Sequence, residues 1–173
     1  MLHITNNSFY TCKPHTKEEL QKIIIERIQD EGPDCDLNDI DVSDITDMSH
    51  LFNANMFFNG HTIFKNFNGD ISMWDVSNVT NMGWMFNGCE KFNCDLSGWD
   101  VSNVEDMFIM FCACNNFNSD ISRWDVSNVK DIEQMFYRCE KFICDLSKWN
   151  VSNVKHIYNA FYGCPTKPKW YKQ

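Results

Sequence analysis

The spacing of hydrophobic residues changes within short stretches of the chain. In residues 71–76, Trp74 and Val76 alternate with polar neighbours, which predicts a short strand with one buried face. From Val79 to Cys89 the apolar residues fall three or four apart, which is the spacing of one helix face. The pattern therefore predicts a unit of strand, turn, helix and turn.

This unit recurs every 25 residues from Phe67 onward, and internal repeats of this length are typical of stacked repeat proteins. Upstream, residues 40–52 match the same frame as a diverged first repeat. The sequence predicts an α/β repeat solenoid, a leucine-rich-repeat-like array of short parallel strands and helices in about five 25-residue coils. Four columns show the period: Trp74, Trp99, Trp124 and Trp149; Val79, Val104, Val129 and Val154; Phe86, Phe111, Phe136 and Phe161; Cys89, Cys114, Cys139 and Cys164.

The two ends differ from the repeats. The run Thr16-Lys17-Glu18-Glu19 is a capping box, and it predicts a helix to about Asp30 that covers the first coil. Residues 1–15 are interpreted as a tail and 16–32 as the capping helix. The array is assigned to residues 33–164, followed by a C-terminal cap or tail at 165–173. Its coils are 33–66, with an insertion at 55–65, then 67–91, 92–116, 117–141 and 142–164.

Composition narrows the function. The 173 residues carry a formal net charge of −9, which disfavours binding to nucleic acid. Because 43% of the residues are hydrophobic, we expect a folded chain. No stretch has the length of a membrane helix, and the start lacks the layout of a secretory signal. We expect no membrane insertion and an intracellular or virion-associated protein, with the cell surface as the second expectation.

The repeated block W-D-V-S-N-V-x-x-M-x-x-M-F-x-x-C-x-x-F-N-x-D-[IL]-S resembles the BspA-like leucine-rich-repeat surface proteins. The resemblance is to their 25-residue mycoplasma-type repeat, which also occurs in large DNA viruses and protists, and it covers about residues 16–164. It implies a right-handed solenoid without enzymatic activity and a role in protein recognition or adhesion.

Two acidic columns are candidates for chemistry: Asp70, Asp95, Asp120 and Asp145, and Asp75, Asp100, Asp125 with Asn150. The first interpretation is that each carboxylate accepts backbone N–H groups in its own turn, as an Asx motif. A calcium ladder is the second, although the glycine-aspartate nonapeptide of calcium-binding β-rolls is absent. The third is a solvated acidic face that binds a basic partner.

The nine cysteines allow several interpretations. The Cys column is expected to be packed and reduced, because cysteines on stacked helices would lie too far apart for disulfides. Cys94 and Cys144 remain candidates for local pairing with Cys89 and Cys139. No four-ligand zinc pattern is present, so no metal and no cofactor are expected.

No nucleophile and base arrangement, phosphate-binding loop or dinucleotide glycine pattern occurs, so no catalytic residue is proposed. Positions that vary between repeats are then the informative ones, because the shared ones are explained by packing. The leading hypothesis is a non-enzymatic module that binds a protein partner; the alternatives are a structural component of a larger assembly, such as a virion or surface layer, and a cell-surface adhesin. The candidate partner-binding residues are Met73, Arg123, Lys148, Asp75, Asp100, Asp125, Trp84, Phe108, Ile109, Tyr137 and Tyr158, together with the insertion.

Overall fold

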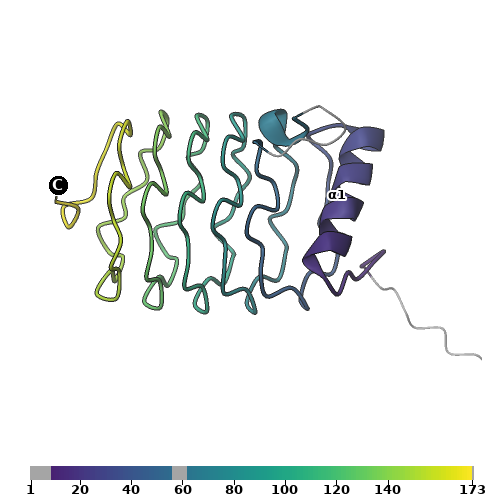
Figure 1. Ribbon diagram of the computed structural model, residues 1–173, viewed down its shortest axis with the longest axis horizontal. Helices are drawn as coiled ribbons and strands as arrows, with labels where there is room; N and C mark the ends of the chain where they lie inside the picture. The colour runs from purple at the N-terminus through teal and green to yellow at the C-terminus, as the bar shows by residue number, and fades with distance from the viewer. Residues whose placement is uncertain (1–8, 56–61, 173) are drawn as a thin grey trace, which may run out of the picture.

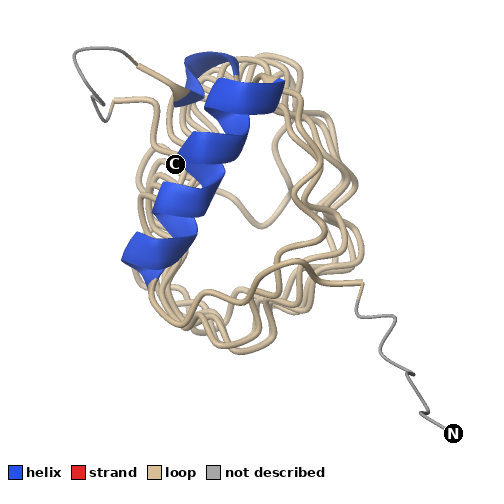
Figure 2. Ribbon diagram, turned by 90° about the vertical axis from the view of Figure 1, so that its right-hand side faces the viewer, coloured by secondary structure: helices blue, strands red, loops and turns tan. Residues whose placement is uncertain are grey.

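The computed structural model describes residues 9–55 and 62–172. Figure 1 shows a row of coils stacked side by side, with the N-terminal helix at one end and the C-terminus at the other. Seen along the row, successive coils follow one outline (Figure 2). Parallel bridges join Asn81 to Asp106 and Asp106 to Asp131, so each 25-residue repeat makes one coil.

The predicted α/β repeat solenoid of parallel strands and helices is wrong. Within the described ranges the regular elements are one α-helix, α1 (Lys17–Glu31), and one short 3₁₀ helix, η1 (Phe64–Asn66). Neighbouring coils are joined in register by isolated bridges, and no longer strand forms in this part of the chain. Consecutive turns replace both the strand and the helix expected in each repeat.

Left-handed residues explain why the segment with helical spacing is not a helix. Trp84, Ile109 and Gln134 hold the same position in successive coils, with φ values of 62°, 58° and 54°. An α-helix needs φ near −60° at every residue, so each of these positions ends a helical path. Instead, Met85 donates its N–H to the Met82 carbonyl at 3.2 Å, closing a turn whose third residue, Trp84, must have positive φ. A second left-handed position follows four residues later, at Gly88, Ala113, Arg138 and Gly163.

Backbone hydrogen bonds between coils run in one direction along this segment. Alternate N–H groups of the coil 92–116 donate to the next coil: Met107 to Asp131 (3.0 Å), Ile109 to Glu133 (2.9 Å), Phe111 to Met135 (2.9 Å) and Ala113 to Tyr137 (2.7 Å). The carbonyls of Met107 and Ile109 accept within their own coil instead, from Met110 and Cys112. Each coil therefore has a donor edge, formed by these alternate N–H groups, that faces its C-terminal neighbour.

Aromatic rings fill the interior in rows. Successive rings of the first row lie 5.3 to 5.7 Å apart between centroids and are nearly parallel, so each ring covers the next. A tryptophan row lies beside them, and the indole N–H of Trp124 donates to the Leu96 carbonyl of the preceding coil at 3.0 Å. The repeated residues are thus structural. The two phenylalanine rows are Phe52, Phe86, Phe111, Phe136 and Phe161, and Phe67, Phe92, Phe117 and Phe142.

Helix α1 lies across the first coil (Figure 2). Its N-cap is Thr16, whose side chain accepts the Glu19 N–H, and its buried residues Leu20, Ile24 and Ile28 belong to the core. Part of the segment predicted as a tail also pairs with this coil, because Thr11 donates its N–H to the Asp39 carbonyl at 2.8 Å.

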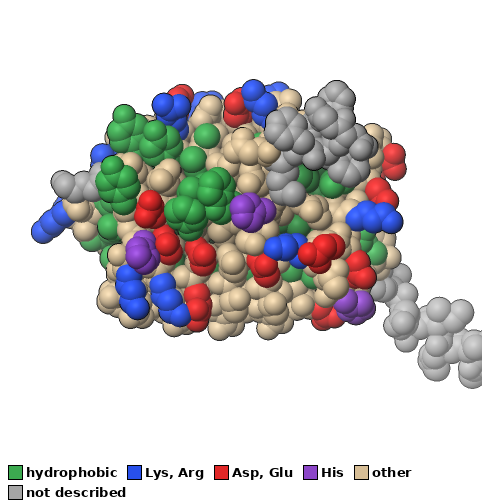
Figure 3. All heavy atoms as spheres, viewed as in Figure 1, with side chains coloured by type: hydrophobic (Ala, Val, Ile, Leu, Met, Phe, Trp, Pro, Cys, Tyr) green, Lys and Arg blue, Asp and Glu red, His purple; other side chains and the backbone are tan. Residues whose placement is uncertain are grey.

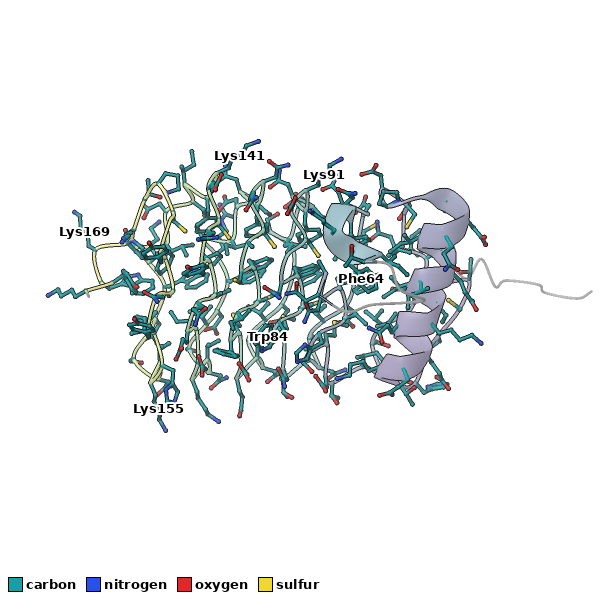
Figure 4. The ribbon with its side chains drawn as sticks, turned by 45° about the horizontal axis from the view of Figure 1, so that its top comes forward. Phe64, Trp84, Lys91, Lys141, Lys155 and Lys169 are labelled. Atoms are coloured by element: carbon teal, nitrogen blue, oxygen red, sulfur yellow. The ribbon has the colours of Figure 1, made fainter. Side chains whose placement is uncertain are left out.

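The other end of the stack carries an unexpected continuation of the tryptophan row. Trp170 donates its indole N–H to the Leu146 carbonyl at 2.8 Å, which is the contact that Trp149 makes with Ile121 one coil earlier. Of the predicted insertion at 55–65, residues 56–61 lie outside the described ranges. Phe64 of η1, near the end of the predicted insertion, is buried (Figure 4).

Candidate interaction surface

Both predicted aspartate columns form turns. In the first column the Oδ1 atoms of Asp70, Asp95, Asp120 and Asp145 accept the N–H of the serine two residues later at 2.9 to 3.0 Å. In the second column Asp75, Asp100, Asp125 and Asn150 do the same at 3.0 to 3.2 Å. The Asx interpretation is confirmed. Among the described residues, no group of three or more His, Cys, Asp or Glu side chains is placed to hold a metal ion.

These hydrogen bonds favour the charged carboxylates. The backbone N–H and hydroxyl of Ser97 lower the pKa of Asp95, and the hydroxyl and N–H of Ser122 lower the pKa of Asp120. A carboxyl group with a lowered pKa stabilises the fold above its unfolded pKa of about 4, and this contribution is lost as the pH falls through the folded value. Acid should therefore weaken the turns of every coil.

The double variant Asp95→Asn/Asp120→Asn should show a smaller drop in melting temperature between pH 5 and pH 3 than the unmodified protein. The amide oxygen accepts the same N–H without titrating, as Asn150 already does with Ser152. Thermal unfolding followed by circular dichroism at both pH values measures this. Glu140→Gln, at an exposed side chain, is the control. Equal acid sensitivity in the double variant and the unmodified protein would contradict the assignment.

A third turn-forming column was not predicted from the sequence. Asp47, Asn81, Asp106 and Asp131 accept the N–H two residues later at 2.8 to 2.9 Å, and they also make the parallel bridges. Burial raises the pKa of Asp131, and Asp106 in the preceding coil adds to the effect. The signal was available, because an Asp or Asn precedes the Met or Ile at this position of every block except the last, which has His156.

The cysteine column packs as expected. The thiols of Cys89, Cys114, Cys139 and Cys164 each donate to a carbonyl of the preceding coil at 3.0 Å. Burial raises the pKa of the Cys89 thiol well above its ordinary value. Cys94 and Cys144 do not pair with Cys89 and Cys139; all nine cysteines are free, and the two thiols face carboxylates instead.

The first group of predicted partner-binding residues lies at one corner of the coils. Met73, Arg123 and Lys148 share one exposed position of the repeat, which Gly98 occupies in the coil between Met73 and Arg123. Asp75, Asp100 and Asp125 share another exposed position two residues later. Beside Lys148 a shallow groove of about 390 Å³ is lined also by Asp120, Ile143 and Asp145. A similar groove lies between Asp70 and Asp95, so the groove belongs to the repeat.

The second group lies on the turn-rich face of the coils. Trp84 stacks on His50 with a centroid distance of 5.6 Å and meets the edge of Phe108 at 5.6 Å (Figure 4). Tyr158 is 64% exposed, the most exposed of these side chains. Ile109 differs, since it is 6% exposed and packs inward from its left-handed backbone position.

Sequence reasoning missed one member of this face. Tyr162 is 52% exposed and stacks on Tyr137 at 5.1 Å. The Arg138 guanidinium lies 5.5 Å from the Tyr137 ring centroid, a distance typical of a cation–π contact. The name aromatic face is used below for Trp84, Phe108, Tyr137, Tyr158 and Tyr162; hydrophobic side chains gather on one side of the stack in Figure 3.

The first group of predicted residues, called the corner group, does not contact the aromatic face in the part of the chain that the structure describes. The corner group consists of Met73, Arg123, Lys148, Asp75, Asp100 and Asp125. Within residues 9–55 and 62–172, no hydrogen bond, ion pair or ring contact connects a side chain of one group to a side chain of the other. Only the aromatic face combines large exposed rings with contacts between neighbouring coils. It is the stronger candidate for recognition.

One family model matches the chain, described as Mycoplasma protein of unknown function, DUF285, at residues 25–65 and 56–171. The chain belongs to this family. The match supports the mycoplasma-type repeat predicted from the sequence. Searches of curated proteins and of solved structures returned no match.

Membership in DUF285 covers the whole stack. The second matched range contains every coil with the full block, and the first begins inside α1 and runs through the diverged coil. In the described part of this DUF285 chain, no helix has the length and apolar character needed to cross a membrane.

Proposed function

We propose that the protein is a non-enzymatic module that binds a protein partner through the aromatic face. The repeated columns are occupied by structural tasks: rings stack in rows, thiols and indoles donate to carbonyls of the preceding coil, and aspartates close turns. The residues left over are those that vary between coils and stay accessible. The resemblance of the block to BspA-like surface proteins supports the same role.

One observation carries the proposal. Tyr158 and Tyr162, in the last coil, are 64% and 52% exposed. Aromatic side chains in folded proteins are usually largely buried. Tyrosine, tryptophan and arginine are the residues enriched in binding hot spots, and the face combines two exposed tyrosines with the half-buried Trp84 and with Arg138. Since Trp84 and Tyr137 are already held by His50 and Tyr162, much of the face is ordered before a partner binds.

Site-specific photo-cross-linking tests the proposal. A benzophenone amino acid is placed at Tyr158 or Tyr162, and at Glu18 on the outer side of α1 as the matched control. In native source material we expect one protein to cross-link from both aromatic positions and not from Glu18. The same set of products from all three positions, or none from the aromatic face, would argue against this function. A further probe at Met73 reports on the corner group.

A further inference from the structure

The last coil leaves its donor edge open. In the coil before it, Ile132 donates its N–H to His156 (2.9 Å), Gln134 to Tyr158 (3.0 Å) and Arg138 to Tyr162 (2.7 Å). The equivalent N–H groups of Ile157, Asn159 and Gly163 have no protein acceptor among the described residues. They belong to the donor edge at the end of the stack, in which Phe161, covered by the Tyr171 ring, lies between Asn159 and Gly163.

Apolar side chains along this edge are also uncovered. Val126, Val129 and Ile132 are 1%, 0% and 1% exposed in the preceding coil. Their counterparts in the last coil, at 151, 154 and 157, are only partly buried. A further chain laid along the last coil would bury them.

The C-terminal segment covers only one side of that coil. Trp170 and Tyr171 pack edge-on against Phe161, with centroids at 5.7 and 5.0 Å, and Phe161 is 1% exposed. In the described structure, residues 165–172 make no hydrogen bond to Ile157 or Asn159. The N–H groups of Ile157 and Asn159 therefore lie on the part of the donor edge that the C-terminal segment leaves open, and Gly163 lies on the other side of Phe161.

Charge is strongly segregated toward the same end. No Asp or Glu follows Asp145, so the acidic residues, 24 in number, all lie in the earlier part of the chain. None of the lysines of the last segment lies within 4.0 Å of a carboxylate in the described structure. Lys169 extends from the end of the stack, and Lys155 lies at the lower edge of the last coil (Figure 4). These lysines are Lys148, Lys155, Lys167, Lys169 and Lys172.

We propose that the donor edge of the last coil binds an acidic protein segment. Backbone carbonyls and carboxylates of that segment accept from Ile157, Asn159 and Gly163, its apolar side chains cover Val151 and Val154, and its charges face the lysines. This site adjoins the aromatic face, because Tyr158 lies between Ile157 and Asn159 in the chain, but it is formed by backbone N–H groups and valine side chains and does not depend on the proposed function.

A second copy of the chain does not fit this edge. Along residues 157–163 two copies would set N–H groups against N–H groups, and at the opposite end α1 covers the first coil. Nucleic acid and anionic lipid would satisfy the lysines but not the row of valine side chains. Charge, hydrogen-bond polarity and apolar surface together favour an acidic peptide.

The test is a nuclear magnetic resonance titration of the full chain with a synthetic peptide of alternating Glu and Val. We expect the largest amide shifts at Ile157, Asn159 and Gly163, and hydrogen exchange at these amides slowed by about tenfold or more. The variant Lys155→Glu/Lys167→Glu/Lys169→Glu should weaken binding by on the order of tenfold or more. The control Lys22→Glu/Lys65→Glu/Lys91→Glu should bind as the unmodified protein does.

Three results would overturn the proposal. One is peptide binding that shifts other coils and leaves these three amides unchanged. Another is an equal loss of peptide affinity in both lysine variants, which would mean that the peptide is attracted by the charge of the protein alone. The third is binding to vesicles of phosphatidylserine and phosphatidylcholine, or to single-stranded DNA, in preference to the peptide. The lysine variants leave Tyr158 and Tyr162 unchanged, so loss of peptide binding in Lys155→Glu/Lys167→Glu/Lys169→Glu with cross-linking from Tyr158 and Tyr162 retained distinguishes this site from the aromatic face.

Discussion

Replacing Phe111 with alanine is expected to lower the free energy of unfolding by about 3–5 kcal/mol, the largest effect of any single substitution considered. Phe111 is fully buried in the middle of the ring rows. Its ring lies 4.0 Å from Phe117, 5.5 Å from Phe86 and 5.7 Å from Phe136, measured between centroids. Truncation therefore opens a cavity that three coils share, and rigid stacked rings collapse poorly into it.

Urea unfolding followed by circular dichroism measures this loss as a lower transition midpoint. Tyr158→Ala is the matched control, because it removes an aromatic ring that is 64% exposed, and its free energy of unfolding should stay within about 0.5 kcal/mol of the unmodified protein. A loss of less than about 1 kcal/mol for Phe111→Ala would show that the rings do not form the main core.

The second large effect is expected for Gly69→Ala, which should lower the free energy of unfolding by about 1–3 kcal/mol. A Cβ atom at Gly69 would lie 2.6 Å from the Cys35 carbonyl oxygen and 2.7 Å from Cε2 of Phe67. The carbonyl is held in place, since it accepts the Asp70 N–H at 3.0 Å, so the backbone between the first and second coils must move.

Gly98→Ala is the control for this substitution. No atom lies within 4 Å of a Cβ built at Gly98, so its thermal stability should be unchanged or slightly raised. Comparing the two melting temperatures separates the steric clash from the general effect of losing a glycine. Equal melting temperatures would mean that Cys35 does not approach Gly69 as described.

The period of the chain was predictable because it depends on residues that repeat. Phe86, Phe111 and Phe136 recur at intervals of 25, and the structure stacks them. The capping helix was predictable because Thr16 and Glu19 form a local signal that needs no tertiary contact.

The local conformation of each coil was not predictable from spacing. Apolar residues three and four apart fit a helix, and they fit consecutive three-residue turns equally well. Ile109 shows what decides between them: a β-branched residue at φ 58° is unfavourable by itself, so the stacked coils impose that conformation. This constraint comes from contacts between coils, so the conformational preferences of the local sequence do not reveal it.

The candidate surface was predictable only in part. Trp84, Phe108, Tyr137 and Tyr158 were found because they differ between otherwise equal blocks. Tyr162 was missed because its role depends on stacking against Tyr137, one coil away. Trp170 was missed for a different reason, since it follows Trp149 by 21 residues and not 25.

Amide hydrogen exchange in the free protein tests most directly whether the coils are joined by one-way donor edges. We predict slow exchange at Met107, Ile109, Ile132 and Gln134, whose N–H groups donate to the next coil, and fast exchange at Ile157 and Asn159. Slow exchange at all six amides would contradict the open edge of the last coil. Fast exchange at Ile109 and Gln134 would contradict the stack itself.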